Sequence, residues 1–172
     1  MTPCDPAGRH RAAAAPIRAR VGIVTVSDTR TAADDHAGAL LRGRLEAAGH
    51  TVARAVIVPD EPAAIAPLVA QWCAAGDLEA VILTGGSGLS RRDQTCDVVA
   101  ALLDKTLPGF GELFRMLSYE QVGAAAMLSR AVAGVVAATL VFSLPGSPAA
   151  CELAMDRLIV PELRHLVWEL RR

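Results

Sequence analysis

AVILTGGSGLSRRDQT, residues 80–95, joins a short apolar run to a loop that contains three glycines, two arginines and an aspartate. The apolar run, residues 80–83, is rich enough in β-branched side chains to form a buried central strand. Asp93 or Thr95 can cap a helix that begins near Val98. Because glycine accepts positive φ and has no Cβ, the loop between strand and helix can bring its backbone N–H groups close to a ligand. This stretch therefore predicts a strand, an anion-binding loop and a helix in succession.

Several well-known phosphate-binding and catalytic motifs do not fit this loop. The only lysine of the chain is Lys105, so the lysine of a P-loop is missing. Arg91 occupies the place of the third glycine of a dinucleotide fingerprint, and Leu89 interrupts a Gly-x-Ser-x-Gly motif around Ser87. Two interpretations remain open: a phosphate or nucleotide site, and a tight turn whose arginines face solvent.

The composition predicts one domain with a small-molecule partner. A chain of 172 residues that is 52% hydrophobic can bury about two-thirds of its unfolded surface in a single core. Lys and Arg number 17 against 18 Asp and Glu, and aromatic residues make up only 3%. The basic surface and stacking platforms of a nucleic-acid-binding protein are therefore absent. The longest apolar run, residues 131–144, is too short to span a membrane, so we expect no membrane partner.

The cysteines and histidines are scattered along the chain. Cysteines stand at positions 4, 73, 96 and 151 without a Cys-x-x-Cys motif, and the four histidines form no His-x-x-x-His motif. This spacing argues against a zinc site and is typical of the reduced cysteines of a cytoplasmic protein. Residues 1–19 place arginines among alanines and prolines without apolar periodicity. We expect them to form a disordered tail before a domain that covers residues 20–172.

Apolar runs that read as strands alternate with segments that read as helices. A pattern of this kind predicts right-handed βαβ units and a three-layer α/β/α fold with a mostly parallel sheet. Between the first two strands, Gly49 is expected to end a helix. The last helix is expected to begin at Ser147-Pro148 and to bend at Pro161. The expected strands are Val21–Val26, Val52–Val58, Ala80–Leu83, Val132–Val136 and Thr139–Leu144.

The expected strands end in polar or glycine-rich segments, which parallel sheets use to bind ligands. Glycine and serine before a helix N-terminus offer backbone donors and hydroxyls to a phosphate. Asp60 and Asp93 bring carboxylates to the same edge, which suits a divalent metal that bridges phosphates. Arg91 and Arg92 could neutralise the remaining phosphate charge. The alternatives are that Asp60 caps the second helix, that Asp93 caps the third, and that the arginines are merely solvated.

Five segments in this order resemble the MoaB/MogA family of molybdenum cofactor biosynthesis proteins: GGSGLSRRDQT, VPDE, PGFGELFR, LSRA and LPGSP. The resemblance covers residues 20–165, and the stretch from 109 to 136 is more similar to the MoaB branch. It implies a three-layer α/β/α fold, a trimer or a dimer of trimers, and binding of molybdopterin at the strand ends. It further implies that the protein adenylylates molybdopterin with Mg-ATP, with Mg²⁺ as the cofactor.

The resemblance also implies roles for particular residues. Asp60 and Asp93 correspond to the aspartates that active members need for catalysis and metal binding. Ser87, Gln94 and Cys96 stand where the family usually has threonine, valine and, in the MogA branch, proline. Ser87 keeps the hydroxyl group. Binding of ATP or molybdopterin is assigned to Ser27, Asp28, Thr84, Gly85, Gly86, Ser87, Gly88, Ser129, Ser143, Pro145, Gly146 and Ser147.

Three functional hypotheses follow. The first is an enzyme, a molybdopterin adenylyltransferase, and the presence of both Asp60 and Asp93 favours it. The second is a non-catalytic molybdopterin-binding or carrier protein of the same pathway, and the third is an assembly module similar to the G domain of gephyrin.

Self-association is expected because so hydrophobic a chain leaves apolar side chains exposed on its surface. Phe110, Leu113 and Phe114 are the candidates for that surface, with an ordinary core position as the alternative.

Overall fold

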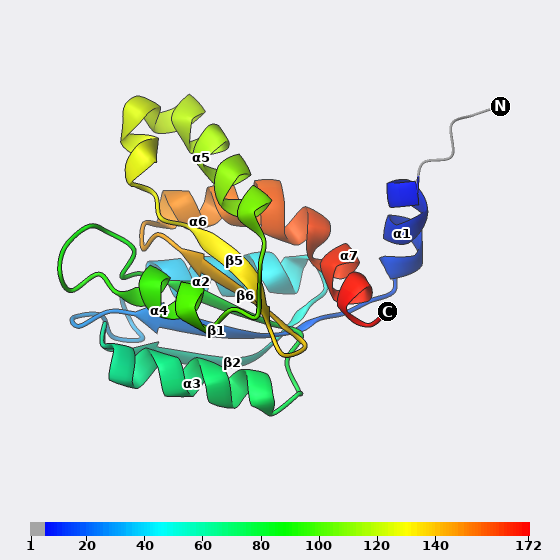
Figure 1. The fold of residues 1–172 in the computed structure, drawn as a ribbon, viewed down its shortest axis with the longest axis horizontal. Coiled ribbons are helices and arrows are strands. Elements are labelled where there is room, and N and C mark those ends of the chain that lie inside the picture. The colour runs from blue at the N-terminus through cyan, green and yellow to red at the C-terminus, as the bar shows by residue number, and fades with distance from the viewer. Residues whose placement is uncertain (1–5) are drawn as a thin grey trace.

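The computed structural model describes residues 6–172 and consists of a six-stranded sheet between two layers of helices (Figure 1). Four strands run parallel at one side, and two short antiparallel strands complete the sheet. This arrangement confirms the expected three-layer α/β/α fold with a mostly parallel sheet. In spatial order the strands are β2 (Thr51–Val58), β1 (Arg20–Val26), β3 (Ala80–Thr84), β6 (Thr139–Leu144), β5 (Val132–Val136) and β4 (Lys105–Thr106).

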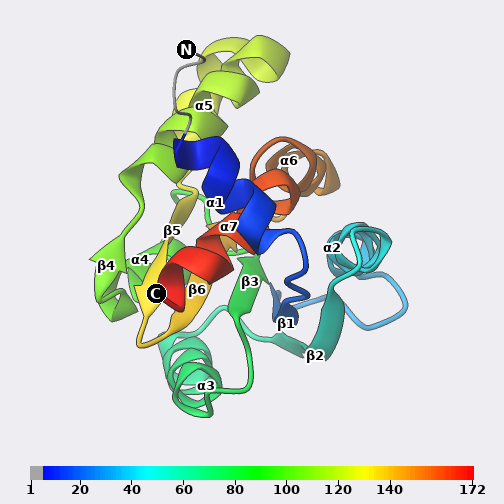
Figure 2. The same ribbon diagram turned by 90° about the vertical axis from the view of Figure 1, so that its right-hand side faces the viewer.

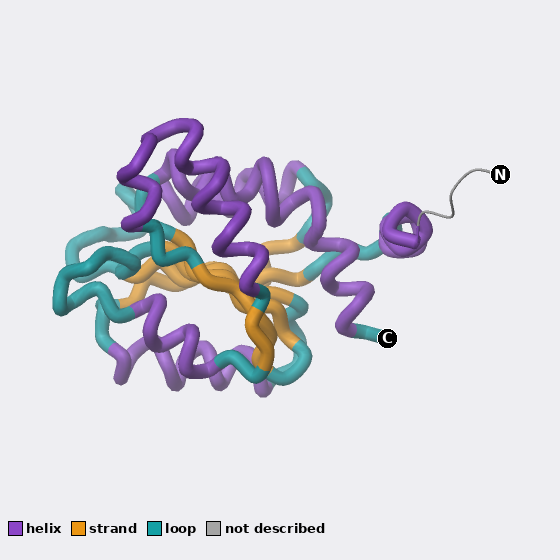
Figure 3. Tube along the Cα trace, turned by 45° about the horizontal axis from the view of Figure 1, so that its top comes forward, coloured by secondary structure: helices purple, strands orange, loops and turns teal. Residues whose placement is uncertain are grey.

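Alternate side chains of the central strand β3 enter two separate cores. Ala80 and Ile82 pack into the core on one face, whereas Val81 and Leu83 pack into the core on the other. Because both faces are covered, every residue of this strand is buried, as its unbroken apolar sequence predicted. The first face is covered by α2 (His36–Ala47), α5 (Pro108–Val122), α6 (Pro148–Ala154) and α7 (Val160–Leu170), and the second by α3 (Pro62–Ala74) and α4 (Thr95–Leu102) (Figure 3).

Local signals set most of the helix ends. The side chain of Asp35 accepts a hydrogen bond from the backbone N–H of Gly38 and caps α2, which ends before Gly49 at a φ of +82°. Ser147 caps α6 by accepting a hydrogen bond from the N–H of Ala150. Both the end of α2 and the beginning of α6 therefore lie where the sequence predicted them.

The structure differs from the sequence-based expectation in the last helix and at a short edge strand. The last helix is interrupted by a π-helical turn over Met155–Ile159 and does not simply bend at Pro161. Proline has no N–H to donate to the carbonyl four residues earlier, so the irregular turn lies directly before it. Residues Gly123–Leu128 form a 3₁₀ helix, η1. Strand β4 was not predicted because its two residues are exposed and too few to show alternation.

The N-terminal segment corrects the expectation of a disordered tail. Residues Pro6–Ala14 form a helix, α1, which packs against α7 (Figure 2). Arg11 donates to Glu162 Oε1 over 2.9 Å, and Arg164 donates to the carbonyl oxygen of Ala15. Because ion pairs, the ring contact of His10 with Trp168 and the small buried side chain of Ala14 hold this helix, its sequence shows no apolar stripe. Residues 1–5 lie outside the part of the chain that the structure describes.

Deletion of residues 1–15 is expected to lower the melting temperature by several degrees. The deletion removes the Arg11–Glu162 ion pair and the buried side chain of Ala14, and it exposes the surface of α7. A loss of about 1–2 kcal/mol corresponds to about 3–6 °C in a domain of this size. Differential scanning calorimetry measures the shift. A control chain that lacks only residues 1–5 retains all of these contacts, and an equal melting temperature for the two truncated chains would contradict the prediction.

None of the helices within residues 6–172 is long and apolar enough to cross a membrane.

Candidate ligand-binding site at the carboxyl ends of the strands

The glycine loop between β3 and α4 adopts a backbone that only glycine fits. Gly85 and Gly86 have φ angles of +106° and +59°, as the sequence predicted. A Cβ atom on Gly85 would lie 2.1 Å from the backbone oxygen of Val26. On Gly86, it would lie 2.2 Å from Thr95 Oγ1 and 2.3 Å from Asp60 Oδ2. The loop therefore turns tightly against both the end of β1 and the carboxylate of Asp60.

Asp60 reaches from the end of β2 to the first residues of α4. Its Oδ1 atom accepts hydrogen bonds from the N–H of Gln94 at 3.4 Å and from Thr95 Oγ1 at 3.3 Å. The alternative that Asp60 caps the helix after it is wrong, because Glu61 holds that position without any side-chain bond. The carboxylate lies instead where a helix N-terminus favours negative charge.

Three carboxylates gather around this point. Burial raises the pKa of Asp60, hydrogen bonds from Gln94 and Thr95 oppose the rise, and the charges of Asp93 and Asp28 add to it, so that the pKa stays above its usual value. Asp28 is also joined to this group directly, because its Oδ1 accepts from the N–H of Asp60 at 3.2 Å. Carboxylate oxygens are the ligands that a hard divalent cation prefers, although the oxygens of these three residues do not all lie within 4.8 Å of one another.

Asp93 lies in the loop and does not cap α4. Its Oδ2 accepts a hydrogen bond from the N–H of Ser90 at 3.0 Å. The residue at the N-terminus of α4 is Gln94, which makes no side-chain capping bond. A Cβ on Gly88 would lie 2.7 Å from Asp93 Oδ2, so the missing side chain of Gly88 leaves room for this carboxylate. The cap alternatives for both aspartates are therefore excluded.

The two loop arginines lie on the surface next to these carboxylates. Arg92 pairs with Asp28 Oδ2 at 2.7 Å, and the arginine side chain of this pair is 65% exposed. Exposed ion pairs of this kind are weak, so a phosphate can compete for the guanidinium. Arg91 is exposed as well.

Arg130 is a loop-binding residue that the sequence analysis missed. Its guanidinium donates to the backbone oxygens of Ser87 at 3.2 Å and Asp93 at 3.0 Å. It also forms two hydrogen bonds with the carboxylate of Asp97, at 3.1 and 2.9 Å. The planar guanidinium of an arginine has enough N–H donors for four such bonds, which fasten the middle of the loop to the beginning of α4. The sequence signal that could have identified Arg130 is its position directly after Ser129, within the LSRA segment.

Three of the expected ligand-binding residues are buried beneath the edge: Thr84, Ser143 and Ser87, of which Ser87 is 9% exposed. Thr84 is buried and donates to the backbone oxygen of Pro145 at 3.0 Å. Ser143 is fully buried, with its hydroxyl 3.4 Å from the thiol of Cys96. These hydroxyls join the strand ends to the neighbouring loops. Their position indicates a supporting role for Thr84 and Ser143.

The remaining expected residues do lie along this edge. The hydroxyl of Ser27 accepts from the N–H groups of Thr29 and Arg30 at 3.3 and 3.1 Å and shapes the first loop. Gly146 approaches the glycine loop so closely that a Cβ there would lie 3.2 Å from the Cα of Gly85. Ser147 is exposed at the N-terminus of α6. Ser129 is half-buried just before β5, whose first residue pairs with the end of β6.

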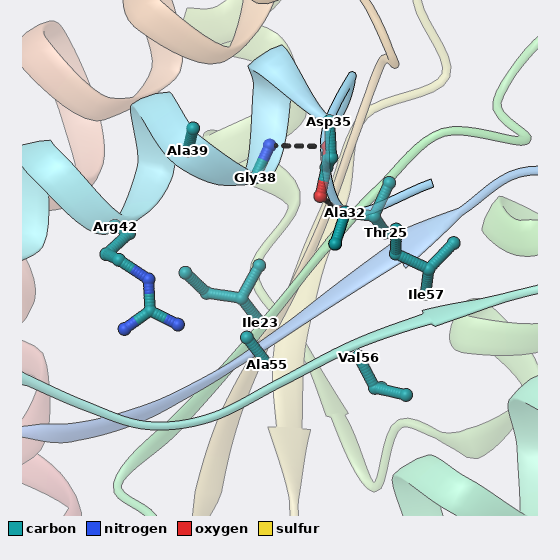
Figure 4. Close-up of a pocket in the computed structure, with 10 residues that line it drawn as sticks. All are labelled: Ile23, Thr25, Ala32, Asp35, Gly38, Ala39, Arg42, Ala55, Val56 and Ile57. Atoms are coloured by element: carbon teal, nitrogen blue, oxygen red, sulfur yellow. Dashed lines mark hydrogen bonds between the residues drawn. The ribbon is translucent and has the colours of Figure 1, made fainter. Parts of the chain in front are cut away.

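A cavity of about 590 Å³ lies beside this edge, between α2 and strands β1 and β2 (Figure 4). Among its polar groups, Thr25 Oγ1 donates to Asp35 Oδ2 at 2.7 Å, Gly38 N donates to Asp35 Oδ1 at 2.9 Å, and Arg42 pairs with Glu46 outside the cavity at 3.4 Å. Its other walls are mainly apolar. The groups that suit a charged ligand therefore lie on the loops at the strand ends, and we place the candidate site there.

Comparison with known proteins identifies the family of this chain. A family model described as a probable molybdopterin binding domain matches residues 22–165. The chain is 50% identical over 159 residues to molybdenum cofactor biosynthesis protein B of Bacillus subtilis, covering 92% of this chain and 94% of the relative. It is 44% identical over 147 residues to the protein of the same name from Escherichia coli K12, covering 86% of each chain.

Solved structures show the same relationship. A crystal structure of a molybdenum cofactor biosynthesis protein B superposes with a TM-score of 0.85 at 48% identity, covering 91% of this chain and 98% of that chain. The tungsten cofactor synthesizing protein MoaB from Pyrococcus furiosus superposes with a TM-score of 0.79 at 36% identity, covering 91% and 99%. A MogA structure superposes with a TM-score of 0.78 at 30% identity, covering 88% and 99%. The chain therefore belongs to the MoaB/MogA family of molybdenum cofactor biosynthesis proteins.

Proposed function

We propose that this protein adenylylates molybdopterin with Mg-ATP, releasing pyrophosphate. The observation that supports the proposal is the grouping of Asp28, Asp60 and Asp93 around a glycine loop at the carboxyl ends of the strands. An adenylyl transfer brings together a triphosphate and a second phosphate, and these need both positive charge and oriented donors. A site with carboxylates, an arginine and a tight glycine loop supplies the protein groups for such a reaction.

The residues divide into two kinds of role. Asp60 and Asp93 would hold Mg²⁺, which offsets negative charge on the phosphates when it is bound. Both side chains offer only oxygen atoms as ligands, which a hard divalent cation prefers. The pKa of Asp60 is raised by burial and by the neighbouring carboxylates, and a bound cation would offset their repulsion. The backbone of the loop from Gly85 to Gly88 and the N-terminus of α6 at Ser147 would orient the phosphates. Arg92 would exchange its exposed partner Asp28 for a phosphate oxygen.

In the reaction, a phosphate oxygen of molybdopterin attacks the α-phosphorus of ATP. A new P–O bond forms, the bond from the α-phosphorus to the bridging oxygen breaks, and pyrophosphate leaves with the electron pair. Arg130 would hold the loop that orients both substrates, through the carbonyls of Ser87 and Asp93. The protein's contribution is thus to position the two substrates and to stabilise charge.

Release of pyrophosphate tests the proposal. Purified protein is mixed with ATP, Mg²⁺ and molybdopterin, and pyrophosphate is followed by a coupled assay, with omission of molybdopterin as the control. Pyrophosphate that forms only with all three components supports adenylyl transfer. Retention of molybdopterin without pyrophosphate would favour the alternative, a non-catalytic molybdopterin-binding or carrier protein.

We also propose that copies of this chain associate through an exposed apolar face on α5 and η1. Of the residues that the sequence suggested, only Leu113 belongs to this face. Phe114 is fully buried, and Phe110 packs against Phe142 with the ring centroids 5.3 Å apart. A monomer rarely leaves so many large apolar side chains in contact with water. The face consists of Leu113, Met116, Tyr119, Val122, Met127 and Leu128.

Wild-type protein at micromolar concentration is expected to scatter light as an oligomer, and Met127→Asp is expected to reduce its mass. Met127 is 78% exposed, so a charge there disturbs an interface more than the monomer fold. Leu89→Asp serves as the control, because Leu89 is also exposed but lies on the glycine loop. Size-exclusion chromatography with light scattering gives the masses. A monomeric wild type would refute self-association.

A further inference from the structure

Two histidines and two glutamates meet where α1 packs against α7. His10 comes from α1, and His165 and Glu169 come from successive turns of α7. The Nδ1 atom of His10 lies 2.9 Å from Glu169 Oε1, and the Nε2 atom of His165 lies 3.5 Å from the same oxygen. One ligand atom from each of the three residues lies within 4.8 Å of the other two. This cluster lies at the end of the molecule opposite the glycine loop (Figure 1).

The ring of His165 is held so that one nitrogen points at this cluster. Its Nδ1 atom lies 2.9 Å from Glu162 Oε2. Its Nε2 atom is buried and makes no hydrogen bond with any residue from 6 to 172. The other oxygen of Glu162, Oε1, accepts a hydrogen bond from Arg11 Nε at 2.9 Å. A carboxylate behind a histidine orients the ring and makes the other nitrogen a better metal ligand.

We propose that His10, His165 and Glu169 bind a divalent transition metal such as Zn²⁺ and that this metal fastens α1 to α7. Two imidazoles and one carboxylate are a common protein ligand set for zinc, with a fourth position open to water. Mg²⁺ prefers oxygen ligands and is not expected to bind here. This site is therefore chemically distinct from the aspartates of the proposed catalytic edge.

The geometry suits a tetrahedral ion after a small movement. Zinc bonds to nitrogen and carboxylate oxygen of about 2.0–2.2 Å place tetrahedral ligand atoms about 3.3 Å apart. The observed distances of 2.9 and 3.5 Å lie on either side of this value. Arg172 pairs with the other oxygen of Glu169 at 3.4 Å and so leaves Oε1 for the metal. The ring of Trp168 packs against His10, with the centroids 4.6 Å apart, and limits its rotation.

This site could not be predicted from the sequence, because its histidines come from opposite ends of the chain. His10 and His165 do not form a motif of short spacing, which was the reason for expecting no zinc site. Only the packing of α1 on α7 brings them together.

Isothermal titration of the untagged, EDTA-treated full chain with ZnCl₂ tests the proposal. We expect one ion per chain in the wild type, loss of detectable binding in His10→Ala, and binding weakened about tenfold in Glu162→Gln. Titration with Co²⁺ should give the visible absorption of a tetrahedral complex in the wild type and not in His10→Ala. His36→Ala is the matched control, since His36 is an exposed histidine of α2. Cys4→Ser excludes a thiolate as the ligand, and both control variants are expected to bind as the wild type does.

Thermal unfolding provides a second, independent measurement. Zinc at about 100 times its dissociation constant is expected to raise the melting temperature of the wild type by about 8 °C. The chain without residues 1–15 should show no such rise, and Mg²⁺ should have no effect on either chain. His10→Gln, which keeps a polar side chain of similar size, guards against a folding defect in His10→Ala. Zinc binding that persists unchanged in His10→Ala and His10→Gln, or its absence in the wild type, would overturn the proposal.

Discussion

Asp93→Asn is expected to slow adenylyl transfer by about 100-fold or more while the fold stays intact. A neutral amide is a much poorer ligand for Mg²⁺ than a carboxylate, so the charge on the triphosphate would lose its stabilisation. The fold should survive because an asparagine oxygen can still accept the hydrogen bond from the N–H of Ser90. Single-turnover formation of adenylylated molybdopterin, measured with wild type and variant, gives the rates.

Asp60→Asn should behave in the same way, and the double variant should be far from additive if both carboxylates act on one metal and phosphate unit. The dependence of stability on pH, and the melting temperature of Asp60→Asn, provide a further check. The pKa of Asp60 is raised in the folded protein, so its contribution to stability is full at low pH and is lost as pH rises through the raised pKa. At neutral pH the charged carboxylate therefore destabilises the fold, and Asp60→Asn should keep or raise the melting temperature while it lowers the rate.

Asp156→Asn is the matched control for both variants, because Asp156 is an aspartate on the distant π-helical turn that pairs with Arg44. It should transfer adenylate at the wild-type rate. Wild-type rates in Asp93→Asn or Asp60→Asn would refute a catalytic role for that carboxylate. A wild type that forms no product would favour the non-catalytic binder.

Gly85→Ala is expected to destabilise the protein by about 3–5 kcal/mol and to lower the melting temperature by about 10 °C. The new Cβ would lie 2.1 Å from the backbone oxygen of Val26, at a φ of +106° that side chains rarely adopt. Because the obstacle is backbone at the end of β1, neither strand can relieve the clash without breaking its hydrogen bonds to the other elements. Chemical denaturation followed by circular dichroism measures the free energy of unfolding.

Two other glycines provide controls for Gly85→Ala. A Cβ on Gly43, in the exposed middle of α2, would meet nothing within 4 Å, so Gly43→Ala should stabilise the protein by about 0.5–1 kcal/mol. Gly88→Ala would meet only the movable carboxylate of Asp93, at 2.7 Å. It should therefore affect adenylyl transfer more than stability. Equal stability of the Gly85 and Gly43 variants would contradict the account of the loop given above.

The central strand and the glycine loop that follows it could be recognised from local patterns in the sequence. Val81 and Leu83 belong to an unbroken apolar run, and the glycines after them mark the turn, so the central strand and its loop could be recognised without the structure. Asp60 and Asp93 follow strand ends, and parallel strands bring such ends together. Where local sequence and tertiary environment favour the same conformation, prediction from sequence succeeds.

Features that depend on distant contacts could not be predicted. Arg130 is an ordinary arginine in the sequence, and only the tertiary fold brings it to the carbonyls of the glycine loop. Helix α1 lacks an apolar stripe, because its partners are Glu162, Glu169 and the aromatic rings of α7. Leu113 and Phe114 are neighbours on α5, yet one is exposed and the other is fully buried. Periodicity alone did not separate their roles.

Hydrogen bonds from the protein's own groups hold the glycine loop in place. Thr95 donates to the carbonyl of Gly86 at its base, Arg130 holds two of its carbonyls, and a turn closes between Ser90 and Asp93. Ordering a flexible loop of ten residues on binding would cost about 10 kcal/mol or more in conformational entropy. Folding has already removed that entropy here. The affinity of this edge for a phosphate is therefore set by its direct contacts and by the water that the phosphate displaces.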